Sequence, residues 1–268
     1  KNLKKPDPCM VSFWLVGGLL VTLILLGGAA VAVPALLGPG HLLSVAREAG
    51  VINAIAVTFA AGFVAVLILI LLGTPLAYVL ARGRSGWNVL IETIIDLPLA
   101  LPHTVAGLMV YLLFMMRGPL GSPFYAVGIV FEDAFAGIVA AMVFVSTPFY
   151  VNAVREGMEK VPERLEYVAR TLGATRYLAF STITLPLSVR PIVSGAFLAW
   201  GRAIGEFAPV IMIAYFPVVV STLIYLRFTT GGLAESRSIA FIMLVVCLLV
   251  FFAFRLVSQG WGRTHDRT

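Results

Sequence analysis

The chain has 268 residues, of which 60% are hydrophobic and 12% charged, and its formal net charge is +6. A soluble domain carries roughly 25% charged residues, so this chain lacks the polar surface that a water-soluble globule needs. Its basic residues are scattered around apolar segments and form no stripe, which argues against nucleic-acid binding. The composition predicts an all-α polytopic membrane protein in which residues 1–268 form a single membrane domain.

Six apolar segments are long enough to cross the hydrocarbon core, which takes about 20 helical residues. The first follows the sequence KNLKK and resembles a signal peptide, but it is long for one, and we interpret it as a retained span. The segment before the last span is fairly apolar and is expected to be re-entrant in part or packed against the bundle. The six spans are expected at residues 11–36, 52–81, 94–116, 134–154, 187–214 and 238–258.

The distribution of basic residues predicts the orientation of these spans. Fourteen of the nineteen Lys and Arg residues fall on the side that holds both termini, and Arg202 lies within a span. Basic loops remain in the cytoplasm, so we expect both termini there, together with the segment 156–186. The four basic residues on the other side are Arg47, Arg117, Arg227 and Arg237.

Polar and helix-breaking residues within the spans are candidates for a transport pathway or gate. Pro98 and Pro102 interrupt the third span and free backbone carbonyls, which membrane depth tolerates only beside protein or water. They either shape a cavity or make a packing kink. His103 either binds an anion or is a hydrogen-bonded structural group. Arg202 and Glu206 are expected to pair on one face of the fifth span, as a site that meets a divalent anion or as a structural ion pair.

The remaining ionisable residues show no pattern of catalysis or metal binding. The two cysteines are not expected to meet, so the sequence predicts no disulfide, thiol or zinc chemistry. No His, Cys and Asp cluster has the spacing of metal ligands, and we predict no metal site. Glu92 and Asp96 are expected at the membrane interface, either solvated or paired with Arg82 or Arg84.

The stretch VPERLEYVARTLGATRYLAFSTITLPL, residues 161–187, is the longest one with charges spaced every few residues. Pro162 suits the first turn of a helix, and Glu163 is favourable near the positive end of the helix dipole. Apolar residues then recur at positions i, i+3, i+4 and i+7, which places them on one helical face. These residues are Leu165, Val168, Ala169 and Leu172.

The same stretch carries signals for the end of this helix and for a second one. Glu166 is spaced to pair with Arg170, Gly173 is expected to end the helix with a left-handed residue, and Thr175 to cap a second helix that returns to the membrane. A helix this short is marginal in water. It therefore leans on its own bundle, on the lipid surface or on a partner, and the mixed charge with an apolar stripe favours a groove on a partner protein.

This stretch resembles the cytoplasmic loop of the membrane subunits of ATP-binding-cassette importers. That loop reads Glu-Ala-Ala, three residues, Gly, nine residues, then Ile-x-Leu-Pro. Here Gly173 is followed, after nine residues, by Ile-Thr-Leu-Pro at 183–186, and Ala169 agrees with the second Ala. Tyr167 and Val168 stand where Glu and the first Ala are usual, so the family's acidic residue is missing from its place.

Three further stretches resemble the permeases of the molybdate, tungstate and sulfate group of importers. They are LPLALPHTVAGLMVYLLF (97–114), FVSTPFYVNAVREGMEKVPERLEYVARTLGAT (144–175) and GAFLAWGRAIGEFAPVIMIAY (195–215), and the likeness covers about residues 50–255. The Gly-Glu-Phe at 205–207, with an Arg four residues before its Glu, is similar to the molybdate/tungstate branch.

The resemblance implies a type I importer permease in the cell membrane that works as a homodimer. It also implies two cytoplasmic ATPase subunits and an external oxyanion-binding protein as partners. The loop at about residues 156–186 is then the segment that docks on the ATPase. The docking residues that it implies are Glu163, Glu166, Tyr167, Val168, Ala169, Arg170, Leu172, Gly173 and Ala174.

The chain has no Gly-x-x-x-x-Gly-Lys-Ser/Thr phosphate loop. We therefore expect it to be no enzyme and to hold no cofactor, with ATP and Mg bound by the partner ATPase. The alternatives are a sulfate or thiosulfate permease and, from a different class, a stand-alone secondary transporter or channel in which the 161–187 stretch is only structural. The sequence leaves open which oxyanion is carried.

Overall fold

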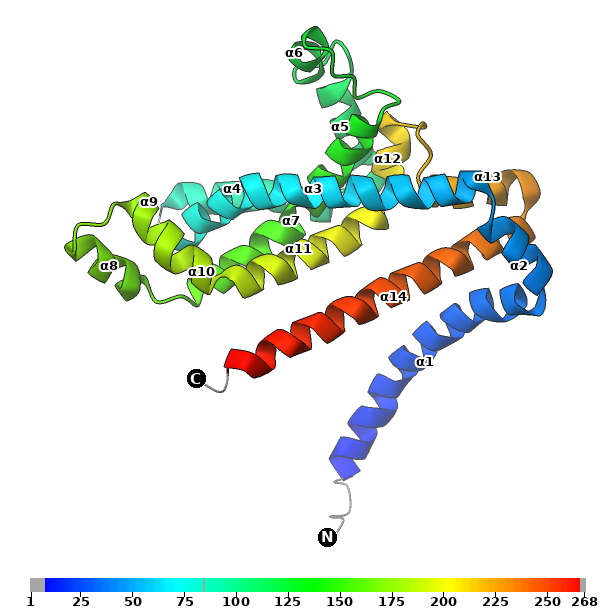
Figure 1. Ribbon diagram of the computed structural model, residues 1–268, viewed down its shortest axis with the longest axis horizontal. Helices are drawn as coiled ribbons and strands as arrows, with labels where there is room; N and C mark the ends of the chain where they lie inside the picture. The colour runs from blue at the N-terminus through cyan, green and yellow to red at the C-terminus, as the bar shows by residue number, and fades with distance from the viewer. Residues whose placement is uncertain (1–7, 84, 266–268) are drawn as a thin grey trace. The chain divides into compact units, whose positions relative to one another are not determined.

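The computed structural model describes residues 8–83 and 85–265, and no strand occurs within these ranges (Figure 1). This agrees with the all-α class expected for a chain that must satisfy its backbone hydrogen bonds inside lipid. The helices are α1 (Pro8–Leu37), α2 (Pro39–Ala46), α3 (Ala49–Arg82), α4 (Gly86–Ala100), α5 (His103–Phe114), α6 (Gly121–Ala126), α7 (Phe135–Glu159), α8 (Glu163–Thr171), α9 (Arg176–Ala179), the π-helical turn η1 (Phe180–Thr184), α10 (Leu185–Leu187), α11 (Val189–Ile204), α12 (Ala208–Ile213), α13 (Val220–Gly231) and α14 (Leu233–His265).

Four of these helices are long and apolar enough to cross a membrane by themselves, and two bent pairs raise the number of candidate spans to six. The four are α1, α3, α7 and α14. The bent pairs are α4 with α5, at 117°, and the α9–α10 segment with α11, at 70°. The expected number of about six spans is therefore consistent with the structure, and the third span is interrupted, as its prolines predicted.

The described helices divide into two compact units. One comprises the described residues up to Ile52 and from Leu223 onward, and the other comprises Asn53–Thr222. The second unit contains every residue that the sequence singled out as a docking or pathway candidate. Each unit has its own packing.

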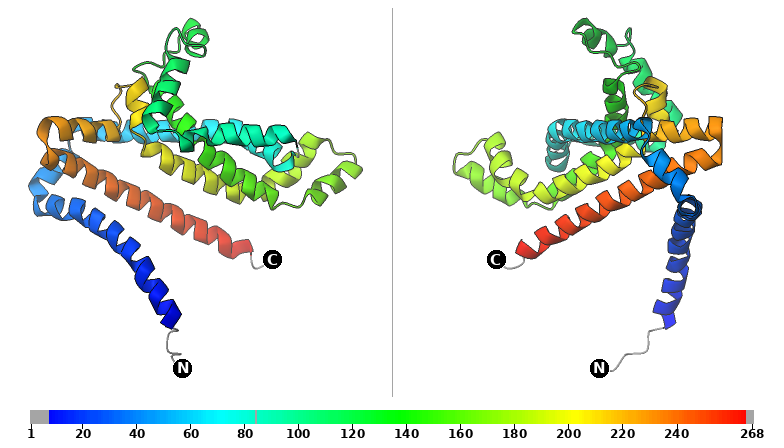
Figure 2. Two further views of the ribbon diagram at one scale, coloured as in Figure 1. Left: turned by 180° about the vertical axis from the view of Figure 1, so that it is seen from behind. Right: turned by 45° about the vertical axis from the view of Figure 1, so that its right-hand side comes forward.

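Helix α7 is the central element of the second unit. It is the most enclosed of the four long helices, and it packs along α11 and against α3, α4, α5 and α12 (Figures 1 and 2). Tyr150 of α7 is fully buried, and its hydroxyl lies 2.7 Å from the hydroxyl of Thr74 on α3. A Cβ on the adjacent Gly73 would lie only 2.7 Å from the Tyr150 ring, so glycine permits the close contact of the two helices.

Two of the expected spans are interrupted in the second unit. Helix α4 continues through Pro98 to Ala100, and the chain turns at Leu101 and Pro102 before α5 begins. Helix α11 ends at Ile204, and Gly205 to Phe207 separate it from α12. The fifth span is therefore not a continuous helix over 187–214, and Glu206 lies in the break instead of on a helical face.

Interfacial charges of the second unit pair differently from the expectation. Glu92 of α4 forms an ion pair with Arg155 of α7 at 2.5 Å, and Asp96 accepts a hydrogen bond from Asn152 at 2.7 Å. Arg82 bonds to α8, as described below, and Arg84 lies outside the described residues. Glu92 and Asp96 thus join α4 to α7, a contact between segments about 60 residues apart that local spacing does not indicate.

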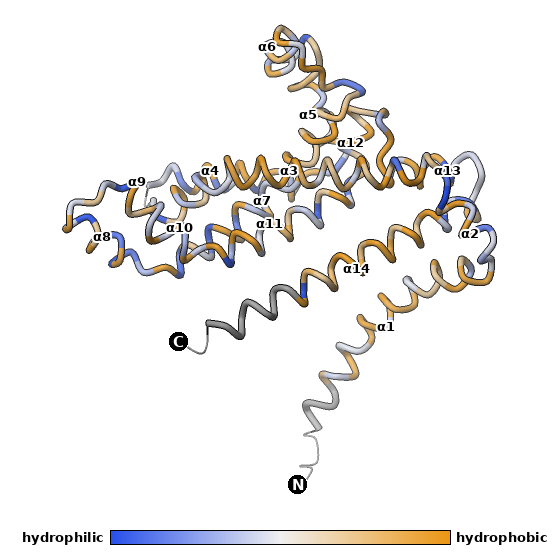
Figure 3. Tube along the Cα trace, viewed as in Figure 1, coloured by the Kyte–Doolittle hydropathy of each residue, from blue (hydrophilic) through white to orange (hydrophobic). Residues whose placement is uncertain are grey.

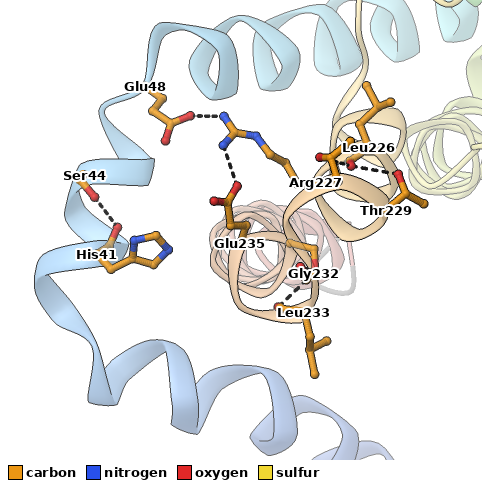
Figure 4. A network of polar contacts seen from close by, with 11 residues as sticks. His41, Ser44, Glu48, Leu226, Arg227, Thr229, Gly232, Leu233 and Glu235 are labelled. Carbon is orange, nitrogen blue, oxygen red and sulfur yellow. Dashed lines mark hydrogen bonds and ion pairs between the residues drawn. The ribbon is translucent and has the colours of Figure 1, made fainter.

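The first unit consists of α1, α2, α14 and the greater part of α13. The candidate spans Phe13–Leu37 of α1 and Leu233–Leu256 of α14 are mostly apolar (Figure 3) and contribute few buried side chains, as expected for helices that face lipid. At one end, Arg227 of α13 binds Glu48 at 2.5 Å and Glu235 of α14 at 3.0 Å (Figure 4). The hydrogen bond to Glu235 and the nearby Glu48 raise the pKa of Arg227, so this link between helix ends stays charged.

Candidate functional site

The helix α8 forms where the sequence predicts it, at one end of the second unit (Figures 1 and 2). It begins at Glu163, one residue later than expected, because Pro162 occupies the cap position before the helix. Glu163 and Glu166 lie in its first turn, where the helix dipole favours negative charge. With four charged residues in nine positions, α8 is a polar helix outside the candidate spans.

Gly173 ends α8 in the predicted left-handed conformation, with a φ of +94°. The amide of Gly173 donates to the carbonyl of Arg170, and the amide of Ala174 donates to the carbonyl of Ala169, which is the Schellman pattern. Thr175 then caps α9, because its hydroxyl accepts a hydrogen bond from the amide of Leu178 at 3.2 Å. The corner between α8 and α9 therefore follows from two sequence signals that the structure confirms.

The two faces of α8 are inverted relative to an ordinary surface helix. Its apolar side chains point away from the unit: Leu165, Val168 and Tyr167 are exposed, and Leu172, the residue after α8, is 85% exposed. The buried face carries a charged residue, Glu166, which is only 8% exposed. The interpretation in which the apolar stripe packs against the chain's own bundle is therefore wrong.

Glu166 connects α8 to two other segments. Its carboxylate accepts hydrogen bonds from the Tyr78 hydroxyl at 2.7 Å and from Arg82 Nε at 2.8 Å, both at the end of α3. The Thr184 hydroxyl of η1 donates to the same carboxylate at 2.5 Å. Glu166 bonds to these groups and not to Arg170, so the predicted i,i+4 pair is wrong. Arg170 lies instead over the ring of Tyr167, at 6.0 Å from its centroid.

These contacts change the acidity of Glu166. Burial raises the pKa of its carboxyl group, but the hydrogen bonds from Thr184, Tyr78 and Arg82, with the positive charge of Arg82, outweigh burial and hold the pKa below its ordinary value of 4.5. Glu166 is thus ionised at neutral pH and engaged within its own chain. The Glu166 carboxylate is therefore not part of the exposed face of α8.

A cavity of about 450 Å³ opens between α4, α7 and the break after α11. It brings together four of the five predicted pathway residues, while Pro102 is not among its lining residues. Its lining includes Pro98, His103, Phe149, Arg202 and Glu206.

Arg202 and Glu206 form the predicted ion pair in this cavity. Glu206 is only 3% exposed, so the pair compensates a carboxylate withdrawn from solvent. The imidazole of His103 lies 3.7 Å from the Glu206 carboxylate and 3.4 Å from the Arg202 guanidinium. The guanidinium also lies over the ring of Phe149, at 5.8 Å from its centroid. In this cavity the positively charged guanidinium of Arg202 thus contacts a carboxylate, an imidazole and an aromatic ring.

Sequence reasoning missed the partners that complete these two clusters. Tyr78, Arg82 and Thr184 surround Glu166, and Phe149 accompanies Arg202. Arg82 and Glu166 are 84 residues apart, and nothing in local spacing joins them. The only sequence signal is the position of Arg82 at the end of an apolar run. The distribution of basic residues predicts this position on the same side of the membrane as the segment 156–186.

Residues 73–263 match the family described as binding-protein-dependent transport system inner membrane component. The chain belongs to this family. It is a multi-pass membrane protein and a transmembrane permease subunit of an ATP-binding-cassette importer.

This chain is similar in sequence to named permeases and similar in fold to a solved importer structure. The chain is 41% identical over 198 residues to the molybdate/tungstate transport system permease protein WtpB of Pyrococcus furiosus, covering 74% of each chain. It is 34% identical over 217 residues to the sulfate transport system permease protein CysT of Escherichia coli, covering 80% of this chain and 78% of that protein. The structure of a bacterial ABC transporter involved in alginate import aligns with a TM-score of 0.67 at 19% identity, over 92% of this chain and 95% of that one.

We predict that removing only one partner of the cavity ion pair destabilises the permease strongly. Arg202→Gln leaves the buried Glu206 carboxylate uncompensated, which costs about 3–5 kcal/mol, whereas Arg202→Gln combined with Glu206→Gln recovers a large part of that loss. Thermal unfolding of the purified variants in detergent measures the difference. Equal stability of Arg202→Gln and the double variant would show that the unpaired Glu206 carboxylate carries no such penalty.

We also predict that Glu166 makes the stability of α8 depend on pH. The folded-state pKa is lowered, so the stabilisation is fully present above the ordinary value of 4.5 and is lost as the pH falls through the folded pKa. Hydrogen exchange of a peptide spanning 163–174, compared between the wild type and Glu166→Gln at each pH, measures this. Exchange in the variant should be about 10- to 100-fold faster near pH 7, since a charged hydrogen bond contributes about 1.5–3 kcal/mol. The two proteins should converge in acid, and a difference independent of pH would contradict the assignment.

Proposed function

We propose that this permease imports molybdate or tungstate as a homodimer. Two cytoplasmic ATPase subunits energise it, an external binding protein delivers the anion, and both termini lie in the cytoplasm. The chain itself catalyses no reaction and holds no cofactor or metal. The observation that carries the proposal is the inverted helix α8, whose exposed apolar face is available to a partner.

The exposed face of α8 supports docking on an ATPase subunit. A solvated helix gains nothing from apolar side chains in water, and burying one such side chain in a groove contributes about 1.5–3 kcal/mol. Tyr167, Val168 and Leu172 supply these side chains, and the Schellman corner at Gly173 fixes the direction in which α8 leaves the bundle. An amphipathic helix held in this way suits a groove on a partner protein.

The cavity around Arg202 supports an oxyanion as the cargo. Arg202 provides donors that match tetrahedral oxyanions, and His103, as the first residue of α5, places the positive end of that helix dipole at the cavity lining. Glu206 offsets part of this charge. A conduit must also release its cargo, and an internal carboxylate that competes for Arg202 keeps anion binding weak.

The names of the relatives favour molybdate and tungstate over sulfate. The archaeal proteins named for molybdate/tungstate transport are 38–41% identical to this chain, whereas the sulfate permease of E. coli is 34% identical. Sulfate transport is therefore the second candidate. A stand-alone secondary transporter or channel receives no support from the family match.

In the proposed cycle, nucleotide-driven closure of the ATPase subunits displaces α8 of each permease. The two permease chains then rock between outward-open and inward-open states, a rigid-body change about the packed helices. The helix breaks at 101–102 and 205–207 supply irregular backbone beside the cavity, where bending needs no loss of regular helix.

Gly173→Val should weaken association with the ATPase. A left-handed backbone costs a β-branched residue about 1–2 kcal/mol, so the dissociation constant should rise about 5- to 30-fold. Co-purification and titration of the ATPase onto the permease in detergent measure this. The matched control is Gly86→Val, because Gly86 also has open space around it but no positive φ. Equal association of both variants with the ATPase would argue against docking through α8.

Substrate choice can be measured by competition in vesicles that carry the full complex. Uptake of radiolabelled molybdate should require ATP, should be inhibited by tungstate at similar concentration, and should need far more sulfate. Equal inhibition by sulfate would favour the second candidate. Uptake by the permease alone, driven by an anion gradient without ATPase subunits, would overturn the importer function.

A further inference from the structure

The inverted orientation of α8 raises the question of how this helix is attached to its own chain. Its apolar side chains face outward, so apolar packing does not provide the attachment. Glu166 receives three side-chain hydrogen bonds from other segments, and Arg82 also donates to the carbonyl of Val161, just before α8, at 2.9 Å. The attachment is therefore polar and directional.

The attachment reaches two segments that lead into the membrane. Tyr78 and Arg82 belong to the last turns of the long helix α3. Thr184 belongs to η1, and Phe180 of the same turn packs on the Tyr78 ring at 4.6 Å between centroids. Helix α11 follows η1 and α10, and its last turn carries Arg202 of the cavity.

The physical character of these bonds makes them suitable for transmitting displacement. Glu166 and Arg82 are both largely buried, and charge-assisted hydrogen bonds in such surroundings are short, strong and fixed in direction. An apolar contact can shift slightly at little cost, whereas a largely buried carboxylate cannot leave its partners without a large desolvation penalty. The π-helical turn at Thr184 is a geometry that frequently occurs at functional positions.

We propose that Glu166 is a positioning residue for energy coupling. It clamps α8 to α3 and to η1, so that a displacement imposed on α8 by the ATPase moves both membrane segments together. This inference rests on the proposed docking of α8, but it assigns a separate task to the opposite face of the helix. The exposed face binds the partner, and the buried face transmits the movement.

Glu166→Gln tests the clamp because glutamine keeps the shape of the side chain and removes its charge. In vesicles with the ATPase and the binding protein, the variant should associate with the ATPase within twofold of the wild type and should still hydrolyse ATP. The number of anions imported per ATP should fall at least tenfold. Arg82→Gln should behave alike, and the double variant should be no worse than either single one, since both remove the same link.

Two matched comparisons keep the result specific. Arg47→Gln makes the same chemical change as Arg82→Gln at an exposed position after α2 and should leave anions per ATP unchanged. Thr184→Val removes one hydroxyl donor from the clamp at nearly constant volume and should reduce the anions imported per ATP, whereas Thr184→Ser retains the donor and should recover it. The Thr184 pair also provides a test if Glu166→Gln fails to fold.

Three results would overturn the clamp. They are wild-type anions per ATP in Glu166→Gln, loss of ATPase association in that variant, and identical behaviour of Thr184→Val and Thr184→Ser. Loss of association would assign Glu166 to the shape of the docking helix instead of to transmission. Failure of the proposed function is distinguishable, since it shows in the wild-type complex, as uptake without ATPase subunits.

Discussion

A charge enclosed by an apolar helical bundle must find an opposite charge or several hydrogen-bond partners, because leaving it alone costs several kcal/mol. In this permease that requirement determines which helix ends meet. Apolar contacts between helices in lipid select neither the partner helix nor the register strongly. An ion pair specifies both the partner helix and the register. The pairs that join separate segments include the largely buried Arg82–Glu166, the partly buried Arg155–Glu92, and the more exposed Arg227–Glu48 and Arg227–Glu235.

The interrupted helices and the buried charges depend on each other. Helix α11 ends at Ile204, which leaves Glu206 in irregular backbone and lets its carboxylate turn back to Arg202. The bend at Leu101 and Pro102 brings His103 to the same cavity. Irregular backbone at membrane depth is tolerated where it lines such a cavity. The polar cavity and the two breaks therefore form one feature of the second unit.

The sequence predicted what depends on composition and local spacing. Apolar runs indicated the long helices, the positions of Gly173 and Thr175 indicated the corner after α8, and a separation of four residues indicated the Arg202–Glu206 pair. It could not predict which face of α8 is buried, because that depends on Arg82, which is 84 residues away.

Other errors have the same origin. Local spacing suggested a Glu166–Arg170 pair worth a few tenths of a kcal/mol, but hydrogen bonds from Tyr78, Arg82 and the buried Thr184 stabilise the Glu166 carboxylate instead. The prolines predicted the interruption of the third span but not its bend of 117°, because a proline inside an apolar run indicates a break without giving its angle.

The outward-facing apolar side chains of α8 also affect the permease before it is assembled. A newly inserted chain without its partner presents Leu172 and Tyr167 to the aqueous phase, and such a surface invites self-association, chaperones and proteases. Surplus copies of the subunit should therefore be short-lived in the cell. The exposed apolar face of this nine-residue helix would then require the cell to synthesise the permease and its proposed ATPase partner in matched amounts.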